Sequence, residues 1–303
     1  MPIDGFLNLL KPPGMTSHDL VAFVRSQVGV HRVGHLGTLD PAAAGVLPVS
    51  LGRATRLFRF AGGPDKSYRA EVAFGVTTDT LDSEGQPTAV ADSSGVSENG
   101  LREMLAGFVG ELELTVPAFS AAHIGGKRSH ELARRGIVTR TRPRHVRVTA
   151  LRLVSFSPGP RARALLDIVC STGTYVRSLA AAWGETAGCG AHLAFLVRTG
   201  AGRFCLSEAL TLEEFARACR AREGTRFLLP MDWPLAYLPA VELEMHRARS
   251  FVRGTGVLAE VGPAWPVRVY APGQRFLGLG EVKQRGQLRP RVVLGAERGN
   301  CCE

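Results

Sequence analysis

The first regular element that the hydrophobic pattern predicts is a helix over residues 18–28. The apolar residues from Leu20 to Val28 recur at helical spacing. Ser17 or Thr16 can cap the N-terminus of this helix, and Gly29 can end it. Residues 101–108 show the same helical spacing further along the chain.

Strand-like patterns dominate the middle of the chain. Residues 68–74 alternate between apolar and polar positions, which is the strand period, and Tyr68 lies on the apolar face. Residues 144–156 and 164–170 also read as strands. Strands and helices without a regular strand–helix–strand alternation predict an α+β fold.

The segment from His31 to Gly52 is rich in Gly and Pro and follows neither period, so we expect mostly loop with short regular pieces. An apolar loop of this length favours a functional role. It holds one carboxylate, Asp40, near His35. The structural alternative is that Asp40 and Pro41 form the N-cap and first position of a helix.

A further helix is predicted after Gly173, where Thr174 is a plausible cap and the apolar residues fall on one stripe. Tyr175 and Arg177 then lie in the first turn, off that stripe, where an arginine is ordinarily solvated. Another helix is expected over 211–222, because Thr211 and Glu214 have capping-box spacing. The proline-rich segment 228–239 is typical of a linker, and the residues after it form a small strand-rich module.

Composition narrows the function classes. The chain has 303 residues, 45% of them apolar and 21% charged, which is ordinary for a globular protein. Its net charge of +10 and pI near 9.9 favour a polyanionic partner such as nucleic acid. Nine basic residues and one acid fall between Lys127 and Arg152. The alternative explanation of that run is a solvated face.

Several classes are not supported by the sequence. The longest uncharged run, from Leu114 to Gly126, has 13 residues and is too short to span a membrane, and the N-terminus does not have the pattern of a signal peptide. Metal-binding, phosphate-loop and nucleophile-elbow motifs are absent from the sequence. The six cysteines show no metal or disulfide spacing, so we expect reduced thiols in a cytoplasmic protein and no metal site.

Four ordered motifs resemble the TruB family of tRNA pseudouridine synthases. Two shorter segments and a tail that looks like a PUA-type RNA-binding module support the resemblance, which covers residues 5 to about 205 almost without a gap. The four motifs are KPPGMTS (11–17), GHLGTLDPAAAGVLPV (34–49), KSYRAEVAFGVTTDTLDSEG (66–85) and CSTGTYVRSLA (170–180), and the supporting segments are GGKRSHELARRG (125–136), FLVRTGAGRF (195–204) and FLGLGE (276–281).

The resemblance implies a pseudouridine synthase fold: a central mixed, mainly antiparallel sheet flanked by helices, followed by a small β-rich PUA-like domain. The expected catalytic domain spans residues 1–238 and carries an RNA-binding insertion at about 76–145. The PUA-like domain is expected over residues 239–303.

The resemblance also implies roles for single residues. Asp40 matches the essential catalytic aspartate, Arg177 matches the arginine that pairs with it, and Tyr68 matches the tyrosine that stacks on the target base. An adjacent guanidinium is expected to hold the carboxylate ionised and to lower its pKa. The remaining expected contacts are with the substrate, through His35, Tyr175, Leu196, Lys11, Lys127 and Arg128.

The expected reaction isomerises uridine 55 in the T loop of tRNA to pseudouridine. The N1 glycosidic bond breaks, the flipped uracil turns, and C5 joins the sugar without a cofactor. The expected enzyme is monomeric and needs no protein partner. Two alternatives remain: a guide-RNA-dependent subunit of the box H/ACA type, which the insertion at 76–145 disfavours, and a tRNA-folding chaperone with incidental catalysis.

The chain departs from the family pattern at several positions. Thr115 to Ala118 stand where Gln-Val-Pro-Pro is usual, and His123 stands where lysine is common. His130 replaces a tyrosine, and Thr172 replaces a lysine. None of these changes touches Asp40 or its expected partners, so we expect altered RNA affinity with the chemistry retained.

Overall fold

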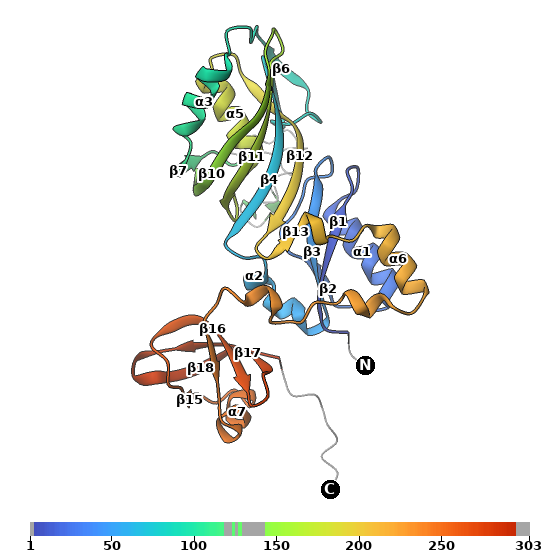
Figure 1. The fold of residues 1–303 in the computed structure, drawn as a ribbon, viewed down its shortest axis with the longest axis vertical. Coiled ribbons are helices and arrows are strands. Elements are labelled where there is room, and N and C mark those ends of the chain that lie inside the picture. Colours follow the sequence, from blue (N-terminus) through green and yellow to red (C-terminus); the bar gives the residue numbers. More distant parts are fainter. Residues whose placement is uncertain (1–2, 118–122, 125–126, 129–142, 295–303) are drawn as a thin grey trace.

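The computed structural model describes residues 3–117, 123–124, 127–128 and 143–294. Its strands form one large sheet with helices against it and one smaller sheet near the C-terminus (Figure 1). The α-helices are α1 (Ser17–Val28), α2 (Phe58–Ala61), α3 (Glu98–Ala106), α5 (Val176–Thr186), α6 (Leu212–Arg220) and α7 (Met245–Val252). The 3-10 helices are η1 (Gly52–Leu57), η2 (Leu206–Glu208), η3 (Gly224–Phe227), η4 (Trp233–Leu235) and η5 (Gln284–Gly286).

The strands of the large sheet are ordered β1-β3-β12-β4-β11-β10-β7, with β2 beside β3 and β13 beside β12. Within this sheet, every described ladder is antiparallel except the short one between β12 and β3. The α+β prediction, with a mixed and mainly antiparallel sheet, is therefore confirmed. The strands are β1 (Gly5–Lys11), β2 (Val33–His35), β3 (Ala44–Leu51), β4 (Asp65–Phe74), β7 (Gly110–Leu114), β10 (Arg144–Ser157), β11 (Arg163–Ser171), β12 (Ala191–Ala201) and β13 (Phe204–Cys205).

Two small hairpins and a second sheet complete the described fold. The hairpins pair β5 (Val76–Thr78) with β6 (Pro87–Val90) and β8 (His123–Ile124) with β9 (Lys127–Arg128). The second sheet has the order β14-β16-β17-β18-β15 and its own apolar core. Its strands are β14 (Ala240–Glu242), β15 (Val257–Leu258), β16 (Ala264–Ala271), β17 (Arg275–Val282) and β18 (Gln287–Val293).

Local sequence signals set the ends of two helices as predicted. Thr16 and Asp19 form a capping box at α1, and Gly29 ends that helix in the left-handed region at φ 66°. Thr211 and Glu214 form the predicted capping box at α6. The predicted cap of α5 is wrong: the N-cap is Tyr175, while the Thr174 hydroxyl donates to the Ser171 carbonyl within the preceding turn.

The prediction of mostly loop over 31–52 is wrong for β3. This strand pairs along its whole length with β1 and is buried from Gly45 to Leu51. A strand covered on both faces has no polar–apolar alternation, so its period is invisible in the sequence. Pro48 fits because β3 has full pairing on one side only.

The segment predicted as a linker is packed against both sheets. Leu235 in η4 is fully buried, and it joins a cluster that holds Phe6 and Leu57 from the large-sheet region and Leu279 and Leu294 from the C-terminal region. Apolar burial therefore connects the C-terminal sheet to the beginning of the chain.

Candidate active site

Asp40 lies in the turn between β2 and β3, and the side chains of Ser17 and Lys11 form hydrogen bonds with the backbone of this turn. The Ser17 hydroxyl donates to the Leu39 carbonyl at 3.0 Å and accepts from the Leu39 amide at 2.9 Å. The Lys11 Nζ donates to the carbonyls of Pro41 at 3.1 Å and Ala43 at 2.7 Å. The backbone on both sides of Asp40 is thus fixed by buried hydrogen bonds, which limits the positions open to its carboxylate.

Lys11 is placed differently from the expectation of a substrate contact. Its side chain is fully buried, and its Nζ also donates to the Pro12 carbonyl at 2.9 Å. Burial lowers the pKa of Lys11 to about 8. In this structure the ammonium supports the Asp40 turn, and it has no exposed surface with which to touch RNA.

We expect Lys11→Met to lower the free energy of unfolding by about 2 kcal/mol, because the ammonium's hydrogen bonds to three carbonyls are lost. Urea denaturation of the variant and the wild type at constant m-value measures this difference. An unchanged denaturation midpoint would show that the ammonium contributes nothing to the fold.

Arg177 projects from the first turn of α5 onto Asp40. Its Nε lies 3.0 Å from Asp40 Oδ2, and its Nη2 donates to Oδ1 at 3.4 Å. The Arg177 side chain is only 6% exposed, whereas that of Asp40 is 41% exposed. The alternative interpretation of Arg177 as a solvated first-turn residue is therefore wrong. The two-point pairing orients the carboxylate and leaves part of it accessible.

Asp82 is a third member of this charge network that the sequence reasoning missed. Its Oδ2 lies 3.3 Å from Arg177 Nη1, and the side chain is 12% exposed. Arg177 Nη1 also donates to the Thr80 carbonyl at 3.0 Å, while the Thr80 hydroxyl donates to Asp82 at 2.5 Å. Asp82 belongs to the motif at residues 66–85, and the only sequence signal for it was an acid in a Thr- and Gly-rich stretch.

The pKa of Asp40 is shifted upward, opposite to the expected direction. Burial raises this pKa most, the Arg177 guanidinium lowers it, and the Asp82 carboxylate raises it again. Arg177 does lower the pKa of Asp40, as expected, but it is only one of the neighbours that act on this carboxylate. The combined effect of burial and the second carboxylate outweighs it.

We expect the rate of any reaction that needs ionised Asp40 to fall on the acid side of neutrality at a pH above 3.8, the ordinary aspartate pKa. Protonation inactivates the carboxylate, so raising its pKa moves the acid limb to higher pH. A single-turnover pH–rate profile locates this limb. A limb at or below pH 3.8, measured on protein shown to stay folded there, would contradict the assignment.

Asp82→Asn is expected to slow turnover by about 10- to 100-fold, because Arg177 loses a carboxylate partner and shifts relative to Asp40. The acid limb should also move to lower pH, since the charge that raises the pKa of Asp40 is gone. Rate and pH profile are measured together on saturating RNA. A slower variant with an unmoved acid limb would show that Asp82 acts without influencing the Asp40 carboxylate.

The other predicted site residues surround this network to different degrees. Tyr68 lies on β4, partly buried, and burial raises the pKa of its hydroxyl, with smaller effects from Arg198 and Asp40. Leu196 on β12 is buried in the main core. Tyr175 is the partly buried N-cap of α5. Tyr68 is therefore within electrostatic range of Asp40. Its stacking role and the substrate contacts of Leu196 and Tyr175 stay predictions.

His35 is the last residue of β2, five positions before Asp40. Its ring lies 6.4 Å from that of His18, edge to face. Burial lowers the pKa of His35, and the nearby His18 and Arg198 lower it further. A neutral imidazole at pH 7 is consistent with packing against a base, which stays the predicted role of His35.

Lys127 and Arg128 form β9. Much of the basic run between Lys127 and Arg152 falls in residues 129–142, which lie outside the described residues. His130 belongs to this stretch, and the side chain of His123 is not described either. The predicted RNA contacts of Lys127 and Arg128 stay predictions. Thr172 is described: its hydroxyl donates to the Gly63 carbonyl at 3.2 Å.

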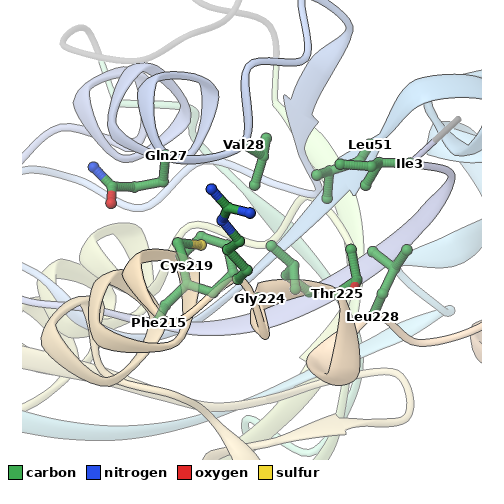
Figure 2. A pocket seen from close by; sticks show the side chains of 11 residues that line it. Ile3, Gln27, Val28, Leu51, Phe215, Cys219, Gly224, Thr225 and Leu228 are labelled. Carbon is green, nitrogen blue, oxygen red and sulfur yellow. The ribbon is translucent and has the colours of Figure 1, made fainter. Parts of the chain in front are cut away.

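A separate pocket of about 160 Å³ opens between α1, α6 and η3 (Figure 2). Its walls are mostly apolar and include Val28, Phe215 and Leu228, with Cys219 at one side. None of the residues that surround Asp40 lines it, so this pocket is not the candidate active site. Within the described ranges, no cluster of His, Cys, Asp or Glu could hold a metal ion, and no helix has the length and apolarity needed to cross a membrane.

Comparison with known proteins identifies the family. The model for the TruB family pseudouridylate synthase N-terminal domain matches residues 25–176, which include Asp40, Tyr68 and Asp82. Models for the tRNA pseudouridylate synthase B C-terminal domain and for the pseudouridine synthase II TruB C-terminal region match residues 177–236 and 239–294. The chain belongs to the TruB family.

TruB relatives are similar over nearly the whole chain. The tRNA pseudouridine synthase B of Symbiobacterium thermophilum is 50% identical over 252 residues, which are 83% of this chain and 82% of the relative. That of Moorella thermoacetica is 46% identical over 302 residues, which are 96% and 99% of the two chains. The TruB resemblance found in the sequence is confirmed.

Solved structures show the same fold. A chain in an H/ACA RNP bound to a substrate RNA containing 2'-deoxyuridine has a TM-score of 0.75 at 22% identity, covering 97% of this TruB chain and 86% of that chain. A chain from a Cbf5–Nop10–Gar1 complex has a TM-score of 0.74 at 25% identity, with 96% and 84% coverage. The predicted pseudouridine synthase fold is therefore confirmed for this TruB protein.

Proposed function

We propose that this protein is a cytoplasmic, standalone tRNA pseudouridine synthase that isomerises uridine 55 in the T loop. The observation that carries the proposal is the two-point ion pair between Asp40 and the buried Arg177 in the turn after β2. The names of the relatives support tRNA as substrate and pseudouridine formation as reaction. Their similarity over most of the chain supports action without an obligate protein partner.

The geometry suits a reaction that rearranges one nucleotide. In the isomerisation the N1–C1' bond breaks and a C5–C1' bond forms, while the proton leaves C5 and N1 gains one, so no redox change or second substrate is needed. An ionised carboxylate can attack a carbon of the sugar or base, or accept a proton, and each of these routes uses Asp40. Arg177 keeps the carboxylate aimed at the reacting atoms, and Asp82 keeps Arg177 in place.

The target base must leave the RNA stack to reach Asp40, because that carboxylate lies in a turn with only part of its surface exposed. In our proposal the ring of Tyr68 stacks on the flipped base, and Leu196 and Tyr175 border it. His35 stands beside the flipped nucleotide. Lys127 and Arg128 contact phosphates, as expected for a basic surface that positions RNA without reading its sequence.

The same proposal assigns the peripheral parts to RNA. Residues 76–145 form the RNA-binding insertion of a catalytic domain over 1–238. Residues 239–303 form a PUA-like RNA-binding domain, and the five-stranded sheet β14-β16-β17-β18-β15 supports this assignment. In this proposal the protein acts as a monomer.

Pseudouridine mapping on an unmodified full-length tRNA transcript tests the proposal. The protein is incubated with the transcript alone, without guide RNA, nucleotide or added metal. We expect pseudouridine at position 55 with the wild type and none with Asp40→Asn. A transcript with cytidine at position 55 controls for the site. Failure of the wild type on a transcript that it binds would refute standalone synthesis, and the guide-dependent and chaperone alternatives would replace it.

A further inference from the structure

Arg198 is a buried cation that the proposed mechanism does not use. It lies on β12 and is 1% exposed. None of the ion pairs among the described residues includes it. Burying a guanidinium without a carboxylate partner is costly, so an arginine here needs a reason that an apolar side chain of similar size would not supply.

The contacts of Arg198 are with the turn that carries Asp40. Its Nε donates to the Val46 carbonyl at 2.6 Å, and its Nη2 donates to the Gly37 carbonyl at 3.1 Å. Its Nη1 reaches the Thr38 carbonyl at 3.5 Å. These acceptors lie on both sides of Asp40 along the chain, so one planar group holds the two ends of the turn together.

The backbone of Arg198 approaches the same turn closely. Arg198 pairs with Gly45 across the parallel ladder between β12 and β3. A Cβ atom on Gly45 would lie 2.2 Å from the Arg198 carbonyl oxygen, so only glycine allows this approach. Both the main chain and the side chain of Arg198 therefore contact the turn that carries Asp40.

Arg198 also contacts Tyr68. The two residues are directly opposite in the antiparallel ladder between β12 and β4. The charge of the Arg198 guanidinium lowers the pKa of the Tyr68 hydroxyl, which burial raises. Ser17 and Lys11 bond to the backbone around Asp40, whereas Arg198 bonds to that backbone and is also the direct ladder partner of Tyr68.

We infer that Arg198 is a positioning residue that sets the place of the Asp40 turn relative to the ring of Tyr68. This inference rests on the proposed function, because it gives Asp40 and Tyr68 their catalytic roles. The carboxylate and the ring must face the same flipped base, and an error of about 1 Å between such groups costs on the order of 100-fold in rate. A rigid planar fork suits this task better than a flexible ammonium.

Arg198→Lys tests the inference, because it keeps the charge and removes the fork. We expect the single-turnover rate constant on saturating tRNA to fall by about 10- to 100-fold, with the Kd for tRNA unchanged within about two-fold. The rate is expressed per folded active site, so that loss of folded protein does not count as loss of rate. A variant with a lower Tm and a rate within about two-fold of the wild type would overturn the inference.

Arg268→Lys is the matched control. Arg268 on β16 has a similar donor set, since its Nε donates to the Leu238 carbonyl at 3.0 Å and its Nη1 donates to the Tyr270 hydroxyl at 3.2 Å. It belongs to the C-terminal sheet, away from Asp40. We expect this control to keep the wild-type rate constant, because saturating tRNA removes any change in RNA binding by the C-terminal sheet from this rate. An equal loss of rate in both variants would also overturn the inference.

Gly37→Ala tests the contact between Arg198 and the turn by changing the residue on the turn side. Gly37 has φ 88°, which disfavours alanine, and an added Cβ would lie 3.6 Å from Arg198 Nη1. We expect a rate loss of similar size to that of Arg198→Lys, and the double variant should lose much less than the product of the two factors. This variant decides the question if Arg198→Lys does not fold. Independent, multiplying effects would count against the inference.

Amide hydrogen exchange gives a readout that does not need activity. In Arg198→Lys, the peptide that covers residues 37–46 should exchange faster, while the peptides of the C-terminal sheet should not change. If the wild type makes no pseudouridine but exchange over residues 37–46 is still faster in Arg198→Lys, the proposed function has failed. The conclusion that Arg198 holds the Asp40 turn in place then remains valid. If exchange over 37–46 is unchanged, the inference fails whatever the activity.

Discussion

Asp40→Asn is expected to reduce pseudouridine formation by about 10⁴-fold, to the limit of detection, while tRNA still binds. The amide has nearly the shape of the carboxylate but can neither attack a carbon nor accept a proton. Arg177 keeps its contact with Asp82 in the variant, so the surroundings of the lost charge should persist. Single-turnover pseudouridine mapping and a filter-binding Kd measure the two properties separately.

The stability of Asp40→Asn provides the control for folding. Because burial raises the pKa of Asp40, the folded state favours the protonated carboxyl. Wild-type stability therefore falls as pH rises from 3.8 through the raised value, and the loss is complete above it. The variant lacks this loss, so its Tm should exceed that of the wild type at pH 7 and the difference should shrink near pH 3.8. An inactive variant with a lower Tm at pH 7 would indicate misfolding and would not support a catalytic role for Asp40.

Arg177→Ala should slow turnover by about 10²- to 10³-fold with a nearly unchanged Kd for tRNA. The Asp40 carboxylate loses its two-point partner and the orientation that this pairing gives. Asp82 is left as a buried acid beside the site, which raises the pKa of Asp40 further, so the acid limb of the rate profile should move to higher pH. Rate constants across pH at saturating tRNA measure both effects.

Arg163→Ala is the matched control for Arg177→Ala. Arg163 also pairs with a carboxylate, Glu71, at 2.6 Å, but the Arg163 side chain is 56% exposed and that of Glu71 is 35% exposed. Exposed pairs of this kind contribute little, so turnover and Tm should stay near wild-type values. A wild-type rate for Arg177→Ala would refute its role, and an equal loss for Arg163→Ala would show a general response to lost arginine charge.

The sequence predicted the elements that carry a period or a cap. The helix at α1 follows from apolar spacing between Thr16 and Gly29, and β4 follows from its alternation around Tyr68. It could not predict β3, since a strand buried on both faces carries no alternation. Thr174 was misjudged because its hydroxyl finds a partner at Ser171, inside the turn before the helix.

The sequence predicted which residues form the site better than it predicted their burial and their pKa shifts. Asp40 and Arg177 came from the family resemblance, but the burial of Arg177 and the part of Asp82 depend on how distant segments meet. The upward shift in the pKa of Asp40 is the sum of opposing neighbours, and no local pattern encodes such a sum. Lys11 shows the same limit, because a lysine in a loop motif gives no sign that three carbonyls will enclose it.

The cluster that joins the two ends of the chain bears on how the protein folds during synthesis. Phe6 in β1 and Leu294, just after β18, are buried in one cluster with Leu57 and Leu279. Arg53 Nη1 also donates to the Leu294 carbonyl at 3.0 Å, and Arg56 donates to the Val293 carbonyl. This apolar surface cannot close until almost the whole chain has left the ribosome, so β1 and η1 must wait, partly uncovered, for the last strand to arrive.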